Sequence, residues 1–281
     1  MIHLHDYCQE TVNSIQTEIE LLKKLDHPNI VKYIDFIQTK TNINIILEYV
    51  EGGSLHQLVK QNGMLGEYLV QVFTKQVLEG LDYLHSQGIV HRDIKGANLL
   101  YTKNGCIKLA DFGYSIRLSD IDKTNSIVGT PYWMAPEIIE PKGNISTACD
   151  IWSLGITIIQ LLTSKPPYYQ LEPYPAMFRI VTDEYPPLPD NISNNLKDFL
   201  IKCFIKDSNK RPKSRDLLNH PWITSPNKKL VKKFINDHDS NAIPESIMNE
   251  LKNKYKNNLS SLTSSSQNEK MPDKIENELK E

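Results

Sequence analysis

Three short polar blocks, arranged in a fixed order in the middle of the chain, constrain its fold more than any other feature. The first is His-Arg-Asp-Ile-Lys-Gly-Ala-Asn at 91–98, the second is Asp-Phe-Gly at 111–113, and the third is Gly-Thr-Pro-Tyr-Trp-Met-Ala-Pro-Glu at 129–137. One three-letter string turns up by chance, whereas three blocks in this order do not. Asp93 and Asp111 are 18 positions apart (111 − 93 = 18), which suits two loops joined by a short hairpin.

These blocks resemble the catalytic loop, the metal-binding triplet and the substrate-docking segment of eukaryotic protein kinases. The resemblance runs from about Gln16 to Trp222. It implies an α+β, bilobal protein-kinase-like fold, with a small β-containing N-lobe and a large, mainly α-helical C-lobe. The first and third blocks resemble the branch that holds mitogen-activated protein kinase kinase kinases and septation-control kinases. Germinal-centre-type kinases are the runner-up and differ typically in the order of the Gly-Ala pair.

The resemblance gives three residues a part in phosphoryl transfer, a reaction that depends on positioning and charge cancellation rather than covalent help from the protein. It implies that Asp93 accepts the proton of the substrate hydroxyl. Lys95, two residues later, brings a positive charge to the γ-phosphate. Thr130 resembles the threonine that hydrogen-bonds both of these residues in serine/threonine kinases. Lys95 and Thr130 therefore favour a serine/threonine kinase over a tyrosine kinase.

The resemblance also implies a cofactor site for ATP and Mg²⁺. Asn98 and Asp111 offer the hard oxygen ligands that Mg²⁺ prefers. The run from Ile46 to Gly53 resembles the hinge between the lobes. There the main-chain groups of Glu48 and Val50 bond the adenine.

Two further side chains complete the adenine site by resemblance. Leu47 would be the gatekeeper, and Leu100 would pack beneath the adenine ring. The alternative for the hinge is a buried strand that ends at two glycines, Gly52 and Gly53.

Four charged or titratable residues around the blocks read as structural rather than catalytic. His91 is a packing and backbone-bonding residue. Asp150 caps the helix that follows it, and by resemblance it also anchors the catalytic loop. Glu137, in an apolar neighbourhood, needs a cationic partner, for which Arg211 is the family-like candidate.

Arg92 is a cation beside the catalytic aspartate, and its charge must be neutralised when the segment after Asp111 becomes ordered. Phosphate on Thr124 or Ser126 would supply the negative charge. Alanine at both positions should abolish activation, and unchanged activity would contradict this prediction.

The order of apolar periods divides the chain into three parts. Residues 1–52 are a partial kinase N-lobe, with strands at 30–37 and 43–50 after a helix at 11–25. Residues 53–223 are the C-lobe, with helices near 68–87, 146–163, 173–184, 193–205 and 213–219. Its apolar stretch at 151–162 is too short for the ~20 residues that span a bilayer, so it predicts a buried core helix. Residues 224–281 are polar and predict a largely disordered tail.

Two parts of the expected ATP site are missing from the N-lobe. A kinase needs a glycine-rich loop over the phosphates and a strand lysine that pairs with a glutamate of the next helix. Glu18 fits that glutamate, but no lysine precedes Lys23 and no Gly-x-Gly-x-x-Gly string occurs. The remaining strands should therefore expose a ladder edge and an apolar face.

Three hypotheses follow from this gap. The chain is an incomplete version of an active kinase, for example one read from an internal methionine, which upstream DNA would reveal. Alternatively, it is a pseudokinase that binds or regulates partners without transferring phosphate. A third hypothesis, an adaptor that uses only the tail, has no positive evidence. The intact set of Asp93, Lys95, Asn98 and Asp111 favours the first.

Composition restricts the partners and the compartment. The formal net charge of −2 provides no long-range attraction to nucleic acid or to an anionic membrane. We expect neither as a partner and expect a protein substrate instead, with another kinase as a candidate. The four cysteines have no paired spacing, so reduced thiols are expected. No signal peptide follows Met1, which favours a cytoplasmic protein.

Overall fold

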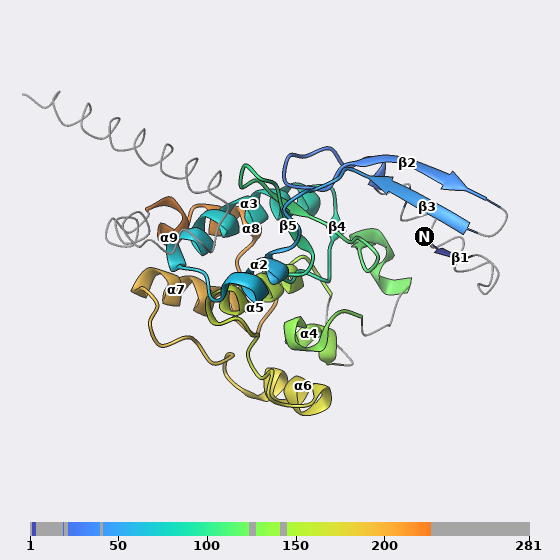
Figure 1. The fold of residues 1–281 in the computed structure, drawn as a ribbon. Coiled ribbons are helices and arrows are strands. Elements are labelled where there is room, and N and C mark those ends of the chain that lie inside the picture. Colours follow the sequence, from blue (N-terminus) through green and yellow to red (C-terminus); the bar gives the residue numbers. More distant parts are fainter. Residues whose placement is uncertain are drawn as a thin grey trace, which may run out of the picture.

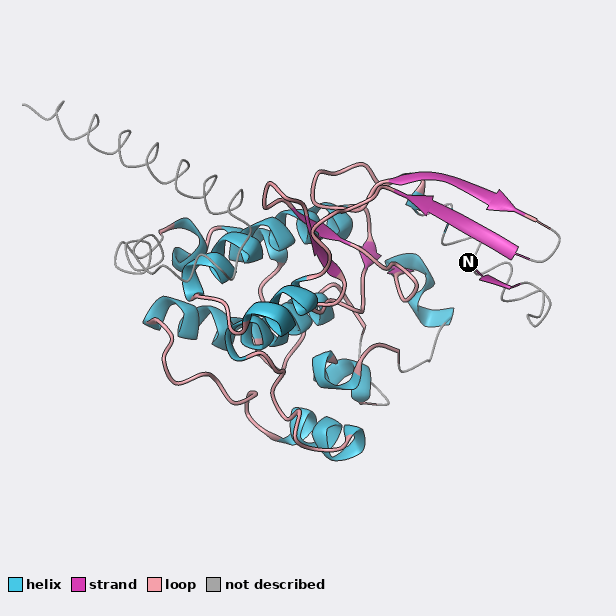
Figure 2. Cartoon of the chain, viewed as in Figure 1, coloured by secondary structure: helices cyan, strands magenta, loops and turns pink. Residues whose placement is uncertain are grey.

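The computed structural model describes residues 2–3, 19, 22–39, 42–123, 128–140 and 145–225. These residues form an α+β fold in which a small strand-bearing part leads into a larger helical part (Figures 1 and 2). The predicted fold class is confirmed. The divisions at 52/53 and 223/224 stay predictions, and the tail beyond residue 225 lies outside the described residues.

The strand-bearing part contains a three-stranded antiparallel sheet. Strand β1 (Ile2–His3) pairs with β3 (Asn42–Leu47), which pairs in turn with β2 (Tyr33–Gln38). The β2–β3 hairpin has an irregularity between Tyr33 and Asp35. The predicted strand 43–50 exists but ends at Leu47, before the glycine pair. Just beyond β3, the Glu48 N–H still donates to Lys32 O, at 2.9 Å, in the segment that leads into β2.

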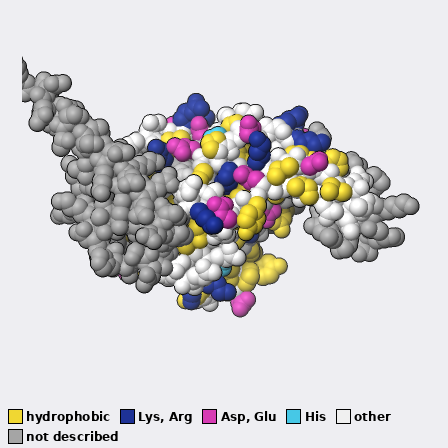
Figure 3. All heavy atoms as spheres, turned by 45° about the horizontal axis from the view of Figure 1, so that its top comes forward, with side chains coloured by type: hydrophobic (Ala, Val, Ile, Leu, Met, Phe, Trp, Pro, Cys, Tyr) yellow, Lys and Arg dark blue, Asp and Glu magenta, His cyan; other side chains and the backbone are white. Residues whose placement is uncertain are grey.

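The two faces of this hairpin differ in burial. Tyr33, Phe36 and Ile45 pack around Ile19 in a small cluster, and Tyr33 and Ile45 also pack against the main core. Several other apolar side chains stay exposed: Ile34 at 59%, Ile37 at 54%, Leu47 at 40% and Ile46 at 36%. Figure 3 shows hydrophobic side chains gathered toward the end of the molecule where β2 and β3 lie. An exposed apolar face of this kind is what the sequence predicts.

The helical part has short helices and hairpins around one long buried helix. Its helices are α2 (Leu55–Asn62), α3 (Glu67–Ser86), η2 (Leu118–Lys123), η3 (Pro131–Trp133), α4 (Pro136–Ile139), α5 (Ala148–Thr163), α6 (Pro173–Thr182), α7 (Asn194–Cys203), α8 (Ser214–Leu218) and α9 (Pro221–Thr224). It also contains two small antiparallel sheets, in which β4 (Ile89–Val90) pairs with β7 (Ile116–Arg117), and β5 (Leu99–Tyr101) forms a hairpin with β6 (Ile107–Leu109). The predicted helices agree with these bounds to within two residues at each end.

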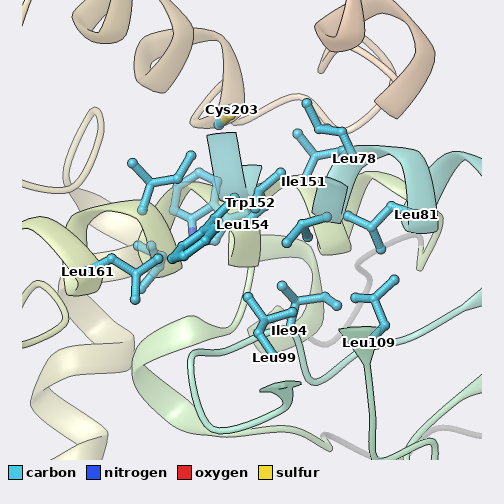
Figure 4. Close-up of a cluster of buried hydrophobic side chains, with 14 of the residues drawn as sticks. Leu78, Leu81, Ile94, Leu99, Leu109, Ile151, Trp152, Leu154, Leu161 and Cys203 are labelled. Carbon is cyan, nitrogen blue, oxygen red and sulfur yellow. The ribbon is translucent and has the colours of Figure 1, made fainter. Parts of the chain in front are cut away.

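Helix α5 is the centre of the main core, as its apolar sequence predicts. Every residue from Ala148 to Leu161 is buried, and Figure 4 shows Ile151, Trp152 and Leu154 among side chains from α3 and the β5–β6 hairpin. Trp152 packs edge-on against Phe204, with ring centroids 5.1 Å apart. Full burial of a large apolar side chain contributes about 1.5–3 kcal/mol, so this helix fixes the frame of the larger part. None of the described helices is both long and apolar enough to cross a bilayer.

The β5–β6 hairpin carries the ends of the first two sequence blocks close together. Its register pairs Leu99 with Leu109, and the Ala110 N–H donates to Asn98 O at 2.9 Å. Helix α3 approaches this hairpin closely at Gly80, where an added Cβ would lie 2.4 Å from a methyl carbon of Leu109. The glycine therefore lets α3 support the hairpin that positions the site.

Candidate active site

The loop before β5 holds the Asp93 side chain at the centre of a polar cluster. Asp93 Oδ1 accepts from the Thr130 hydroxyl at 2.9 Å, and Asp93 Oδ2 lies 2.7 Å from Lys95 Nζ. The Asn98 amide donates to Oδ2 at 2.8 Å and to Asp93 O at 2.9 Å. Thr130 Oγ1 in turn accepts from Lys95 Nζ at 2.7 Å. The first and third sequence blocks are thus joined through one carboxylate that is almost fully buried.

Asp150, in the first turn of α5, holds the backbone of this loop from below. Its oxygens accept from the N–H groups of His91 (2.9 Å) and Arg92 (2.8 Å) and from His85 Nε2 (2.9 Å). Burial raises the pKa of Asp150, but the hydrogen bond and charge of His85 and the N–H of His91 outweigh burial and lower it overall. The predicted anchoring contact is present. The predicted N-cap is wrong, because Thr147 precedes the helix while Asp150 faces the loop.

Arg92 adopts a left-handed backbone conformation, with φ of 65°. Such a conformation is uncommon for a side chain other than glycine, and the two N–H bonds to Asp150 hold it in place. Arg92 Nε donates to Tyr114 O at 2.5 Å, whereas its Nη1 is buried without a hydrogen-bond partner among the described residues. Burial lowers the pKa of the guanidinium. Thr124 and Ser126, the predicted phosphate carriers, lie outside the described residues.

The side chains of Asn98 and Asp111 both lie at the open end of the β5–β6 hairpin, just before β5 and just after β6. Because the Asn98 amide nitrogen donates twice to Asp93, its side-chain oxygen is the atom left for a ligand. Asp111 has a left-handed backbone with φ of 62°, and its exposed carboxylate accepts one long hydrogen bond among the described residues, from Gly113 N (3.4 Å). No group of three or more His, Cys, Asp or Glu side chains in the described ranges is placed to hold a metal. Two ligands still fit Mg²⁺, which keeps water and phosphate oxygens.

The predicted hinge connects β3 to α2 and is fastened through the Glu48 side chain. Its Oε1 accepts from Lys32 N (2.7 Å) and lies 2.8 Å from Lys108 Nζ on β6. Val50 is buried, and no described backbone group accepts its N–H. Leu47 ends β3 directly before this stretch and is 40% exposed, whereas Leu100 is partly buried on β5, where it forms a bridge with Ser54. Among the described residues, the Val50 N–H thus remains available to bond a flat polar ligand such as adenine.

Two other predictions concern residues around the site. Arg211 forms a buried bidentate pair with Glu137, with Nη–O distances of 2.6 and 2.9 Å, and this confirms the predicted partnership. Glu18, the predicted partner of the missing lysine, lies outside the described residues.

Sequence reasoning missed two residues that position the site, His85 and Lys108. Each contacts a predicted residue from far away in the chain, His85 with Asp150 at a separation of 65 positions and Lys108 with Glu48 at 60. No local pattern marks such contacts. Only the packing of α3 on α5 and the register of β5–β6 bring them together.

The geometry agrees with the comparison to known families. The family model described as "Protein kinase domain" matches residues 2–223. The chain belongs to the protein kinase domain family.

Its curated relatives place it within one branch of that family. It is 56% identical over 232 residues to MAP3K epsilon protein kinase 1 of Arabidopsis thaliana, covering 82% of this chain and 17% of that protein. It is 57% identical over 224 residues to cytokinesis protein sepH of Emericella nidulans (80% and 16%). It is 54% identical over 222 residues to cell division control protein 7 of Schizosaccharomyces pombe (79% and 21%). The predicted branch is confirmed, while the chain spans about a fifth or less of each relative's length.

Proposed function

We propose that this chain transfers the γ-phosphate of ATP to serine or threonine hydroxyls of a protein substrate. The observation that carries the proposal is the Asp93 carboxylate, held at once by Thr130, Lys95 and Asn98. Oδ1 accepts only the Thr130 hydroxyl among the described residues, so one of its lone pairs is left for a substrate hydroxyl. Asp93 then orients that hydroxyl and accepts its proton, a contribution worth about 10²–10⁴-fold in rate.

Lys95 and the metal-binding pair serve the phosphate. The Lys95 ammonium lies between Asp93 and Thr130 and is partly exposed, at 21% of its side chain, so it can meet the transferred phosphate beside the hydroxyl. Asn98 and Asp111 would hold Mg²⁺. When bound, MgATP supplies the phosphoryl group and the cation that offsets its charge. Leu47, Glu48, Val50 and Leu100 would hold the adenine.

Two further parts of the proposal concern the kind of protein substrate and the location in the cell. The relatives named MAP3K support another protein kinase as the substrate. A cytoplasmic location is supported by Cys149 and Cys203, which are buried thiols outside any disulfide. The competing pseudokinase hypothesis has no observation among the described residues in its favour.

A kinase assay with the full chain, MgATP and serine-, threonine- and tyrosine-containing peptides tests the proposal. We expect phosphate on serine or threonine peptides, and at least about a hundredfold less with Asp93→Ala. Asp35→Ala is the matched control, because Asp35 is an exposed aspartate on β2 whose Oδ1 bonds only its neighbour's N–H (2.8 Å). Equal incorporation by the wild type and Asp93→Ala would support the pseudokinase hypothesis instead.

A further inference from the structure

A tight turn of the backbone over residues 95–98 sets the positions of two side chains that serve the proposed reaction. Lys95 Nζ and the Asn98 amide both reach the Asp93 carboxylate. The Asn98 N–H donates to Lys95 O at 2.9 Å and closes the turn. We call it the 95–98 turn. Its position in the molecule decides whether Lys95 and Asn98 meet Asp93 together.

Gly96, in the middle of the 95–98 turn, has both of its backbone polar groups bonded from other elements. Its oxygen accepts from the His56 N–H at 2.9 Å, and its N–H donates to Gln160 Oε1 at 3.2 Å. His56 is the second residue of α2, where helix N–H groups have no partner within the helix. Gln160 lies on α5 and is only 3% exposed. The turn is thus bonded to two helices that also contact each other (Figure 1).

The side chains of Gln160 and His56 also bond each other. Gln160 Nε2 lies 3.2 Å from His56 Nδ1. Because the Gln160 oxygen already accepts from Gly96, its NH2 group faces the imidazole and Nδ1 accepts. Three hydrogen bonds therefore link Gly96, His56 and Gln160 in a closed ring, and each bond orients the next.

The ring leaves no space for a side chain at position 96. A Cβ added to Gly96 would lie 2.9 Å from Gln160 Oε1 and 3.3 Å from both Gln160 Cδ and His56 N. In a close-packed interior, a methyl group there would displace the Gln160 amide. The glycine thus lets α2 and α5 come close enough to bond the turn.

Helix α5 holds the loop of residues 91–98 on both sides of Asp93. Asp150, in its first turn, bonds the backbone before Asp93, and Gln160 bonds the backbone after it. The two anchors are 10 positions apart (160 − 150 = 10), about 15 Å along a helix. Thr157, between them, contributes less, because its hydroxyl lies closer to an oxygen of its own helix (2.8 Å) than to Ile94 O (3.3 Å). Gln160 is therefore the anchor that fixes the second half of the loop.

We propose that Gln160 and His56 are positioning residues for phosphoryl transfer, which hold the 95–98 turn so that Lys95 and Asn98 stay at Asp93. Neither side chain touches the reacting atoms. The proposal rests on the proposed function for the reaction itself. Loss of a positioning group misplaces the groups that act in the transition state, so it lowers kcat and leaves the binding of the peptide nearly unchanged.

Steady-state kinetics with MgATP and a serine acceptor peptide measure kcat and KM separately. Gln160→Met keeps the side-chain volume but removes both hydrogen bonds, so kcat should fall about ten- to hundredfold while the peptide KM stays within about twofold. Gln160→Glu should keep kcat within about threefold, because a carboxylate accepts from Gly96 and from the other tautomer of His56. His56→Ala should lower kcat by a smaller factor than Gln160→Met, because its backbone N–H still bonds Gly96.

Gln71→Met is the matched control for the loss of a buried amide. Gln71 is 6% exposed on α3, and its amide donates to Trp222 O on α9. This variant should lower the urea midpoint about as much as Gln160→Met but leave kcat unchanged.

Substitution of Gly96 tests the ring from its other side. Gly96→Ala should lower kcat as Gln160→Met does. Gly96→Ala/Gln160→Ala should cost no more than Gly96→Ala alone, because the amide that the methyl group displaces is absent.

An NMR measurement tests the ring without enzyme activity. Selective ¹⁵N-glycine labelling gives one backbone amide signal for each of the 12 glycines, and the signal lost in Gly96→Ala identifies Gly96. Exchange of this amide with solvent should become at least about tenfold faster in Gln160→Met, but not in Gln71→Met.

The outcomes distinguish the positioning role from the proposed function. Phosphate transfer by the wild type, with kcat unchanged in Gln160→Met or equally lowered in Gln71→Met, overturns the positioning role alone. The same follows if Gln160→Glu loses as much kcat as Gln160→Met, or if the Gly96 amide exchanges no faster in Gln160→Met. No phosphate transfer by the wild type overturns the proposed function and the positioning role with it.

Discussion

The catalytic cluster and the β2–β3 hairpin are built in opposite ways. Around Asp93, groups from the catalytic loop, the third sequence block and α5 bond one another, and several of these hydrogen bonds join parts of the chain that are far apart in sequence. The hairpin keeps apolar side chains such as Ile34 and Ile37 more than half exposed. Local stability follows buried apolar contact and protected hydrogen bonds. Among the described residues, the cluster around Asp93 is therefore more constrained than the β2–β3 hairpin.

Two ion pairs near these regions, Arg211–Glu137 and Lys108–Glu48, differ in a similar way, and removing the cation of each is the strongest test of the contrast. Arg211→Met leaves the buried Glu137 carboxylate unpaired, so we expect a loss of about 3–5 kcal/mol in the free energy of unfolding. Lys108→Met removes the partner of Glu48 beside the hinge, where both side chains keep some solvent contact (14% and 27%). Here about 1 kcal/mol or less is expected.

Urea unfolding of the two variants measures both values. Glu137→Gln combined with Arg211→Met should recover part of the loss, because the unpaired charge is gone. Equal losses for Arg211→Met and Lys108→Met would show that the two regions are not differently constrained.

Shortening one apolar side chain in the main core and one in the hairpin should give the next largest difference in stability. Leu81 on α3 is fully buried in the main core, so Leu81→Ala should cost about 2–5 kcal/mol through lost burial and the cavity left behind. Ile37 on β2 is 54% exposed, so Ile37→Ala should change stability by about 0.5 kcal/mol or less. Thermal and urea unfolding report both. A large loss for Ile37→Ala would mean that another part of the protein covers this face.

The two regions also differ in how much the sequence could predict. The 151–162 helix and the hydrogen bonds of Thr130 followed from apolar pattern and motif, because those signals are local or lie in a fixed order. The end of β3 at Leu47 and the cap of α5 at Thr147 were missed by a few residues. The end of a strand depends on its pairing with the neighbouring strand, which the local sequence does not show. The Asp150 carboxylate faces a loop instead of capping its own helix, and the local sequence does not show this either.

Removing single hydroxyls compares the two regions in catalysis. Thr130→Val deletes the bond to the Asp93 carboxylate, and a hydrogen bond to a charged group is worth about 1.5–3 kcal/mol, so kcat/KM should fall about ten- to hundredfold. Thr130→Ser should keep most of the activity. Thr39→Val, in the turn after β2 where the hydroxyl bonds Asn42 O at 3.2 Å, is the matched control and should leave kcat/KM unchanged. A similar fall for Thr130→Ser would point to the methyl group rather than the hydroxyl.

The smallest expected effect is a dependence of stability on pH that separates His91 from His27. Burial lowers the pKa of His91 below its usual value near 6.5, although the charges of Asp150 and Asp93 oppose this. As the pH falls past about 6.5, this histidine therefore binds a proton in the unfolded chain, whereas in the native chain it stays neutral until a lower pH. Stability that is present above pH 6.5 is lost as the pH falls toward the native pKa.

From pH 7.5 to pH 6, this linkage should cost the wild type at most about 1 kcal/mol. His91→Gln, whose amide can still donate to Ala110 O in place of the ring nitrogen (3.2 Å), should show a correspondingly flatter profile in urea unfolding. His27 is half-exposed and stacks on Tyr83 of α3, with ring centroids 5.0 Å apart, and its pKa is also lowered mainly by burial, so His27→Gln should flatten the profile less. An equal change in both variants would mean that the buried catalytic loop excludes protons no better than this half-exposed position, and the constraint on the loop would then be one of packing alone.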